Sequence, residues 1–168
     1  MDDLVERNGL FYEKFTDVPF TGEISDSYKF ITSTRFIEGK FKEGKKDGLW
    51  KKYYENGHLF KKGNFKDGKE EGLWEFYHEN GQLRSKGNFK DGKQEGLWEF
   101  YLENGQLWEK GYLKDGKSDG LVEYYYENGQ LKRKVNYKDG KEDGLWKYYD
   151  KNGNLEKTEI YKNGVLVE

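Results

Sequence analysis

A repeat of 24 residues governs most of this chain. The segment Gly72-Leu-Trp-Glu-Phe-Tyr-His-Glu-Asn-Gly-Gln-Leu83 recurs from Gly96 to Leu107 with a single difference, His78 against Leu102. The same spacing relates the glycines that begin units one to five, which are Gly48, Gly72, Gly96, Gly120 and Gly144. A fixed period of this size indicates stacked supersecondary units that pack on their neighbours. Function is therefore expected on an extended surface rather than in a catalytic pocket.

The composition supports this interpretation once the repeat is considered. With 37% charged residues and a mean hydropathy of −1.18, the chain would ordinarily tend toward disorder. However, 14 Tyr, 11 Phe and 5 Trp recur periodically and supply surface for a thin sheet to bury. The chain has no Cys, which excludes a disulfide framework and a Cys-based zinc site. A net charge of −2 predicts no attraction to nucleic acid through bulk charge.

Each unit has the pattern of two strands. Asn-Gly and Asp-Gly pairs favour the type I′ turns that close two-residue hairpin loops. The units alternate the two pairs, so that Asn80-Gly81 is followed by Asp91-Gly92. Alternating turns about 12 residues apart predict an antiparallel meander. The expected fold class is all-β, an elongated single-layer antiparallel β-meander built from 24-residue hairpin units.

The repeats also predict the strand register. A two-residue loop at Asn80-Gly81 places Glu79 opposite Gln82, His78 opposite Leu83 and Trp74 opposite Gly87. The same register forms three opposite-charge pairs, which are Glu75 with Lys86, Glu99 with Lys110, and Glu123 with Lys134. A three-residue loop would shift the register by one and set Glu99 against Glu109. Because like charges directly opposite each other are destabilising, we expect the two-residue loop.

This register divides the side chains between two faces. One face is expected to carry the Trp column, the Phe and Tyr rows beside it and the Leu that follows each Asn-Gly, with Trp74 lying over Gly87 of its own unit. The other is expected to carry the row that includes Tyr77 and the Glu and Lys pairs. Since the sequence supplies no second layer, the aromatic face must curl on itself or bind something.

The chain is expected to have three parts. Residues 1–45 are degenerate capping strands and a first repeat, residues 46–162 are five 24-residue repeats, and residues 163–168 are a C-terminal edge strand. Terminal repeats of arrays are commonly atypical because they cap the stack. A terminal edge strand also offers unpaired backbone groups, through which a homodimer could form.

The stretch Gly63-Asn-Phe65-Lys-Asp-Gly68-Lys-Glu-Glu-Gly72 resembles the core of the MORN (membrane occupation and recognition nexus) repeat. The 24-residue spacing and the segment from Tyr53 to Leu59 are more similar to the bacterial MORN variant repeat. Phe11-Tyr-Glu-Lys and Pro19-Phe-Thr-Gly22 resemble the usual N-terminal segment of that family. The resemblance implies a MORN-like repeat scaffold, lipid-headgroup binding or dimerisation, and a role as the antitoxin component of a toxin-antitoxin pair.

No motif in the sequence predicts catalysis. His58 and His78 occupy unequal positions in their units, and neither lies near a Ser or Cys nucleophile. Single acids 24 residues apart, such as Asp67 and Asp91, do not make the oxygen cluster that Ca²⁺ requires. No phosphate loop or dinucleotide fingerprint is present. We therefore predict a protein that is not an enzyme, with no catalytic residue, no metal site and no cofactor.

Two columns of residues vary inside the otherwise strict array. The residue after the Tyr row, which includes Tyr77, varies as Tyr54, His78, Leu102, Tyr126 and Asp150. The residue after each Leu varies as Phe60, Arg84, Trp108, Lys132 and Glu156, and it is expected on the opposite face. Variation within an array marks surface that folding does not dictate. The predicted partner-binding residues are Trp74, Phe76, His78, Trp98, Phe100, Leu102, Trp108 and Tyr126.

The leading functional hypothesis is a repeat scaffold that binds a protein partner, such as a toxin or effector. The alternative is a peripheral module that binds membrane lipid headgroups or a cell surface. Nucleic acid is not expected as a partner, because Lys86, Lys110 and Lys134 are paired with glutamates. The sequence has no apolar run of membrane-spanning length and no signal-peptide pattern at Met1-Asp-Asp-Leu-Val. The compartment stays open between the cytoplasm and, if a signal was removed, the cell surface or exterior.

Overall fold

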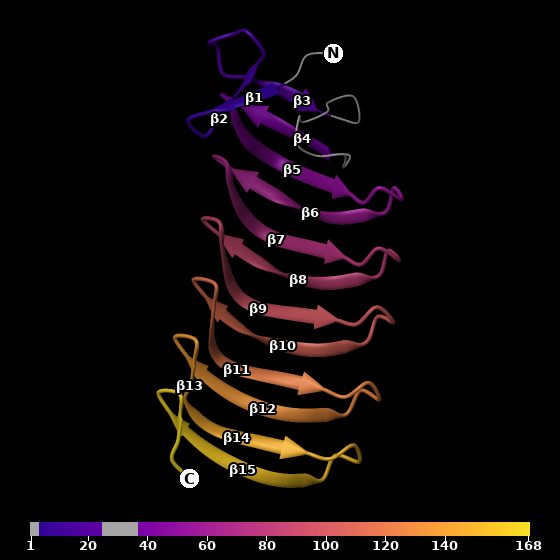
Figure 1. Ribbon diagram of the computed structural model, residues 1–168, viewed down its shortest axis with the longest axis vertical. Helices are drawn as coiled ribbons and strands as arrows, with labels where there is room; N and C mark the ends of the chain where they lie inside the picture. The colour runs from indigo at the N-terminus through magenta and orange to yellow at the C-terminus, as the bar shows by residue number, and fades with distance from the viewer. Residues whose placement is uncertain (1–3, 25–36) are drawn as a thin grey trace.

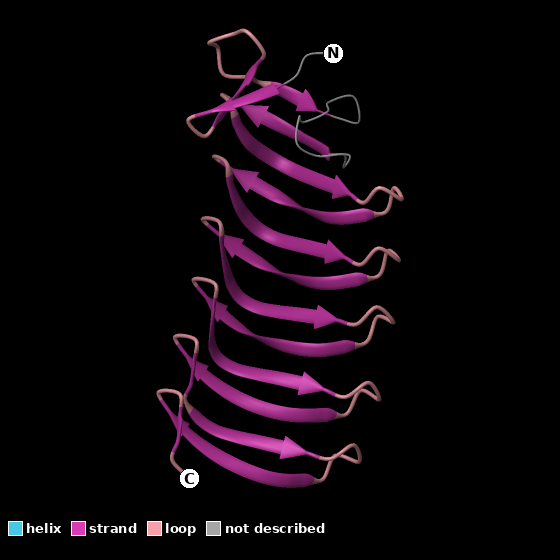
Figure 2. Cartoon of the chain, in the orientation of Figure 1, coloured by secondary structure: helices cyan, strands magenta, loops and turns pink. Residues whose placement is uncertain are grey.

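The computed structural model describes residues 4–24 and 37–168, and these form a long, open, curved sheet (Figure 1). Strands and turns make up this part of the chain, which contains no helix (Figure 2). The strands are β1 Leu4–Arg7, β2 Leu10–Glu13, β3 Gly22–Ile24, β4 Ile37–Lys42, β5 Lys45–Tyr53, β6 Leu59–Lys66, β7 Lys69–Tyr77, β8 Leu83–Lys90, β9 Lys93–Tyr101, β10 Leu107–Lys114, β11 Lys117–Tyr125, β12 Leu131–Lys138, β13 Lys141–Glu142, β14 Gly144–Tyr149, β15 Leu155–Lys162 and β16 Val165–Leu166.

The main sheet is a meander in which each strand pairs with its neighbours in sequence, except that both β13 and β14 pair with β12. Its 14 strands run from β3 to β16, all pairings are antiparallel, and the two ends do not meet. The predicted fold class, an elongated single-layer antiparallel β-meander of 24-residue units, is confirmed. The strands β1 and β2 form a separate hairpin at the N-terminal end of the sheet (Figure 1).

The Asp-Gly turns have the predicted geometry. Asp67 and Gly68 both have positive φ angles, of 51° and 85°, and Lys66 pairs with Lys69 across a two-residue loop. This combination defines a type I′ turn, which Asp tolerates because its short side chain fits the left-handed region. The same conformation recurs at the later Asp-Gly turns.

The Asn-Gly turns differ from the prediction. Gly81 has a φ of 86°, whereas Asn80 is not among the described residues with positive φ. The His78 N–H donates to the Gln82 carbonyl at 2.8 Å, and the Gly81 N–H donates to the His78 carbonyl at 3.0 Å. These bonds close a three-residue loop with glycine in the left-handed position. The predicted pairs of Glu79 with Gln82 and of His78 with Leu83 are therefore wrong.

A β-bulge beside each Asn-Gly loop restores the register in the body of the unit. In unit two, Tyr77 pairs with Leu83 and Phe76 with Ser85, so Arg84 is an extra residue in β8. Beyond it, Trp74 pairs with Gly87 and Glu75 with Lys86, as predicted. In unit three the extra residue is Trp108, which keeps Glu109 opposite Phe100. Because of this bulge, the three-residue loop does not place Glu99 opposite Glu109, the like-charge pair that had favoured a two-residue loop.

The bulges also change which face two columns occupy. Leu83 lies opposite Tyr77, so the Leu column belongs to the face with the Tyr row, not to the aromatic face as predicted. The residue after each Leu lies on the aromatic face, because Trp108 contacts the rings of Phe100 and Tyr124. Its predicted position on the opposite face is wrong. A bulge places two consecutive residues on one side of the strand, which reverses the alternation beyond it.

Three of the Trp residues pack on a glycine of the unit before their own, which are Trp50 on Gly39, Trp74 on Gly63 and Trp98 on Gly87. A Cβ on Gly87 would lie 2.3 Å from the Trp98 ring, and one on Gly63 would lie 2.2 Å from Trp74. The predicted pairing of Trp74 with Gly87 exists in the backbone register, but the indole that covers Gly87 is that of Trp98. The Trp98 indole N–H also donates to the Asn88 carbonyl at 3.2 Å. The Trp column therefore joins units rather than closing each hairpin.

The first glycine of each unit bends the strand that carries it. In β7, Gly72 and Leu73 are extra relative to β6, because Gly63 pairs with Trp74 and Asn64 with Glu71. Gly72 has a φ of 70°, which a residue with a Cβ adopts only under strain. Repetition of this bend in the five units curves the whole sheet (Figure 1).

Both ends of the array depart from the repeat. At the N-terminal end, Leu4 and Phe20 pack with Ile24, Phe41 and Trp50 into a buried cluster beneath the β1–β2 hairpin. Near the C-terminal end, Val135 replaces the glycine of the earlier units and pairs with Val122. Strand β12 pairs with β14 at only two positions. The ladder is interrupted at Val135, which has a side chain where the earlier units have a glycine.

We predict that Gly87→Val lowers the free energy of unfolding by about 1 to 3 kcal/mol, because its side chain displaces the Trp98 ring. Adding Trp98→Val should recover at least about 1 kcal/mol relative to the sum of the two single changes. Adding Trp74→Val instead should give an additive loss. Urea denaturation of the single and double variants measures both couplings, and a larger coupling with Trp74 would contradict the packing between units.

Candidate functional site

A continuous series of ring contacts forms the base of the aromatic face. Phe65 contacts Trp50 and Trp74 with centroid distances of 5.8 and 5.1 Å, and Phe89 contacts Trp74 and Trp98 at 5.9 and 5.3 Å. These contacts are edge-on, the arrangement that aromatic quadrupoles favour. Trp74 and Trp98 are each only 1% exposed. Their burial gives these two predicted partner-binding residues a role in packing.

The other predicted site residues lie above this base. Phe76 and Phe100 are half-buried and form a second row of rings, in contact with the buried Trp98 at 6.1 Å each. Trp108 is 38% exposed and lies 6.3 Å from the rings of both Phe100 and Tyr124. The structure therefore brings Phe100 and Trp108 together on one open surface.

The two variable columns lie side by side on this same face. Tyr54 contacts Phe60 at a centroid distance of 5.0 Å in unit one, and the Lys132 ammonium lies 5.4 Å from the Tyr126 ring in unit four. Each contact joins the residue after the Tyr row to the residue after the Leu of the same unit. Residues that differ from unit to unit are thus gathered on the aromatic face, along its Asn-Gly edge.

Several residues of this edge also connect neighbouring units. The Tyr54 hydroxyl donates to the Tyr77 carbonyl at 2.7 Å, and the Tyr126 hydroxyl donates to the Tyr149 carbonyl at 2.9 Å. His78 Nε2 lies 2.9 Å from the Tyr101 carbonyl and must carry the donated proton, since a carbonyl oxygen only accepts. Leu102 has no group able to make this bond. The predicted site residues His78 and Tyr126 are therefore partly structural.

Cationic side chains cover many of the rings. The Lys61 ammonium lies 4.8 Å from the Trp74 ring, and the Arg84 guanidinium lies 5.7 Å from the Phe60 ring. At the N-terminal end, Phe11, Trp50 and Phe65 line a hollow that also contains Lys46 and Lys61. Burial lowers the pKa of the Lys46 ammonium, and the nearby Lys61 lowers it further. Lys51 and Lys52 also line this hollow, together with the single acid Glu6.

Glu109, in the middle of this face, is not among the site residues predicted from the sequence. It is the direct cross-strand partner of both Phe100 and Tyr124. Burial raises the pKa of the Glu109 carboxyl, and the charge of Arg133 lowers it in part. Burial, followed by the Glu109 charge, raises the pKa of Tyr124 to about 12. A comparison of this position between units would have found Glu109, because Lys61, Ser85, Arg133 and Lys157 occupy it elsewhere.

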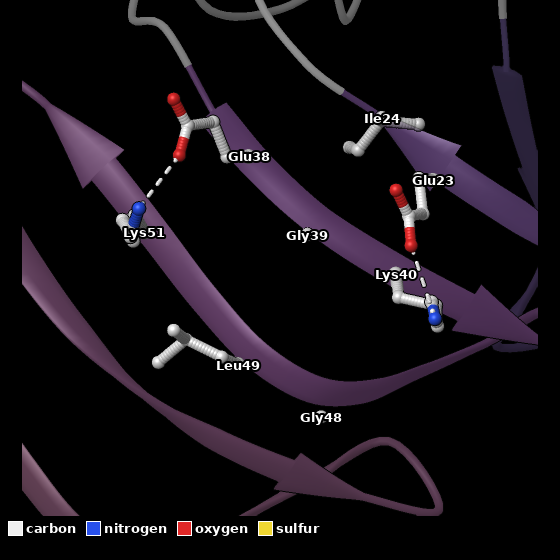
Figure 3. A pocket seen from close by; sticks show the side chains of 8 residues that line it. All are labelled: Glu23, Ile24, Glu38, Gly39, Lys40, Gly48, Leu49 and Lys51. Atoms are coloured by element: carbon white, nitrogen blue, oxygen red, sulfur yellow. Dashed lines mark hydrogen bonds and ion pairs between the residues drawn. The ribbon is translucent and has the colours of Figure 1, made fainter.

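The opposite face carries paired charges together with the Tyr row and exposed leucines such as Leu73 and Leu97. Lys62 pairs with Glu75 at 2.7 Å and Lys86 with Glu99 at 2.8 Å. A hollow at its N-terminal end is lined by the same kind of pair, Lys51 with Glu38 at 3.1 Å and Lys40 with Glu23 at 3.0 Å (Figure 3). Each charge in these pairs has a partner within the sheet, so this face has little net field to attract a ligand.

Glu123 is the most strongly held carboxylate of that face. It pairs with Lys110 at 2.9 Å and Lys134 at 2.7 Å, and it accepts a hydrogen bond from the Tyr125 hydroxyl at 3.0 Å. Burial alone would raise its pKa, but these three donors together lower the pKa of Glu123 to about 2. The carboxylate therefore stabilises the folded state while it is ionised.

Among residues 4–24 and 37–168, no group of three or more His, Asp or Glu side chains is arranged to hold a metal ion. Within the same ranges, no helix is long and apolar enough to cross a membrane.

We predict that Glu123→Gln lowers the free energy of unfolding by about 1 kcal/mol at pH 7. Because the folded pKa of about 2 lies below the ordinary value of 4.5, this difference should be complete above pH 4.5 and should vanish as the pH falls toward 2. Denaturant titrations at several pH values measure it, with Glu103→Gln in an exposed loop as the control. A difference between Glu123→Gln and the parent that does not change with pH would contradict this account.

Comparison with known proteins places the array in a family. No curated protein matches the chain. The family model described as the MORN repeat variant matches five consecutive segments, residues 46–67, 70–91, 94–115, 118–139 and 142–163. Each match contains one Asn-Gly loop and ends on the residue that precedes the glycine of the next turn, and together the matches cover more than half of the chain. The chain thus belongs to the MORN repeat variant family.

Proposed function

We propose that this protein is a non-enzymatic scaffold that binds a protein partner through the aromatic face. One observation carries the proposal: the two columns that vary between units lie beside each other on that face, above a frame of Trp, Gly and Phe that varies little. A sheet that needed those positions for folding would repeat them. Their variation instead supplies chemistry that differs along the array, as specific recognition of a protein requires.

The geometry favours an elongated partner segment. Each unit contributes two strands and so advances about 10 Å along the sheet. The predicted contacts in units two and three, which include Phe76, Leu102 and Trp108, therefore span about 20 Å. Half-buried and exposed aromatic side chains of this kind are typical anchors of protein interfaces.

The family resemblance suggests what the partner is. Bacterial members of the family are associated with neutralisation of toxins, and we propose a toxin or effector protein as the partner on that ground alone. Such binding requires an extended complementary surface but no catalytic group on this chain. The proposal therefore assigns no reaction to His58, His78 or the carboxylates.

A second candidate function is the binding of anionic lipid headgroups. The observation that favours it is the hollow beside Trp50, where Lys46 and Lys61 lie close enough that Lys61 lowers the pKa of Lys46. Binding to vesicles with anionic lipid should then decrease steeply between about 50 and 200 mM salt, whereas aromatic docking to a protein should persist. Co-sedimentation with Lys46→Gln as the matched variant tests this candidate.

The protein-binding proposal is tested with a photo-crosslinking residue at Leu102, on the aromatic face, and at Leu97, which is 41% exposed. Capture from the source cells should occur from position 102 and not from position 97. The identified partner is then purified, and its affinity for the variants is measured by calorimetry.

We expect Leu102→Ala and Trp108→Ala each to weaken binding of that partner at least tenfold, or about 1.4 kcal/mol, with little change in thermal stability. His78→Ala should weaken binding and also cost about 1 kcal/mol of stability, because it removes the bond to the Tyr101 carbonyl. Normal affinity of the Leu102 and Trp108 variants, together with loss of binding in variants of Tyr77 and Tyr101, would locate the interface on the other face.

A further inference from the structure

The two residues that follow each Leu of the Asn-Gly loops supply a cation to the aromatic face in four of the five units. These pairs are Phe60-Lys61, Arg84-Ser85, Trp108-Glu109, Lys132-Arg133 and Glu156-Lys157. Every cation among them lies over a ring: Lys61 over Trp74 at 4.8 Å, Arg84 over Phe60 at 5.7 Å, Lys132 over Tyr126 at 5.4 Å, Arg133 over Tyr124 at 3.9 Å and Lys157 over Tyr148 at 4.4 Å. Unit three alone has an aromatic and an acid in this place.

Unit three retains its own rings, Phe100 and Trp108, without a cation, whereas the adjoining ring, Tyr124 of unit four, already carries Arg133 at 3.9 Å. Phe100, Trp108 and Tyr124 contact one another in series at 6.3 Å, and the bulge at Trp108 sets the Glu109 side chain beside the same rings. Within the described part of the chain, no Lys or Arg lies over Phe100 or Trp108. Two uncovered rings and a carboxylate together attract a cation more strongly than either feature alone.

The Glu109 carboxylate makes no hydrogen bond or ion pair with any residue of 4–24 or 37–168. Arg133 pairs with Tyr124 on the next strand and lies over its ring, and its charge only partly offsets the effect of burial on the pKa of Glu109. A half-buried carboxylate without a partner is costly. A cation from outside the chain would remove that cost.

We propose that Phe100, Trp108 and Glu109, with Tyr124 and its bound Arg133 at one side, form a socket for an arginine or lysine side chain of the protein partner, with arginine preferred. This inference rests on the proposed function and names the chemistry of its central contact. The sheet itself shows the preference, because the same frame accepts a guanidinium from Arg84 and from Arg133 in the neighbouring units. A guanidinium can stack on a ring and donate N–H groups to Glu109 at the same time, which a quaternary ammonium cannot do.

The direct test titrates the full chain with the peptide acetyl-Gly-Arg-Gly-amide and follows the indole N–H resonance of Trp108 by NMR. The control peptide carries citrulline, which keeps the shape of arginine without its charge. We expect saturation by the arginine peptide with a Kd of about 1 to 10 mM and binding of the citrulline peptide at least tenfold weaker. Equal effects of the two peptides, or no saturation by the arginine peptide, would overturn the proposal.

The matched variant is Glu109→Lys, which copies the residue that units one and five carry at this position. Its lysine should occupy the socket from within, so the arginine peptide should no longer saturate while the circular dichroism spectrum stays that of the parent. Glu109→Gln should weaken binding of the arginine peptide about tenfold. Glu156→Gln, in unit five, should leave binding of the peptide unchanged. A Glu109→Lys chain that binds the arginine peptide like the parent would contradict the socket.

Two further measurements distinguish failure of the socket from failure of the proposed protein-binding function. Tetramethylammonium that binds as tightly as the arginine peptide would assign the socket to a quaternary ammonium headgroup instead and would overturn the proposal. With the purified partner, Glu109→Lys should weaken binding at least tenfold. If Leu102→Ala weakens binding of the partner but Glu109→Lys does not, the socket is refuted and the scaffold function stands. If Leu102→Ala leaves binding of the partner unchanged, the scaffold function itself is refuted.

Discussion

The packing of an indole ring on a glycine of the preceding unit is the contact on which this sheet depends. A single-layer sheet has no second layer to cover its side chains, so each unit must bury its largest apolar group against a neighbour. Trp74 and Trp98 do so by occupying the space that a side chain at Gly63 or Gly87 would fill. Their N–H groups donate to the carbonyls of Asn64 and Asn88, so the rings are buried without an unpaired donor.

The ordered aromatic face follows from this packing. Once each Trp is fixed between two strands, the Phe side chains on either side meet it edge-on, and the row of Phe76 and Phe100 lies above it. The region around Val122 and Val135 shows the converse. There the glycine under Trp146 is replaced by a valine, and the ladder between β12 and β14 is shortened to two pairs.

The division between constant and variable positions gives the array its functional character. Cations of the chain itself cover rings in units one, two, four and five, which lowers the exposed aromatic area and places positive charge along the face. Unit three differs in both residues of the pair Trp108-Glu109. The centre of the array therefore has a chemistry that its ends do not have, although the backbone of all five units is nearly the same.

The fold class, the 24-residue unit, the Asp-Gly turns and the register in the body of each hairpin follow from the sequence alone, because alternation and charge pairing depend on local spacing. The Asn-Gly loops are visible only in the three-dimensional structure, since a three-residue loop and a bulge cancel and leave the register of Glu75 and Lys86 unchanged. The same bulge moved Trp108 to the aromatic face and set Glu109 among the rings. Trp74 and Trp98 are both backbone neighbours of Gly87, so the register does not show which indole lies over that glycine. The direction of the rings decides it, and Trp98 of the next unit packs on Gly87.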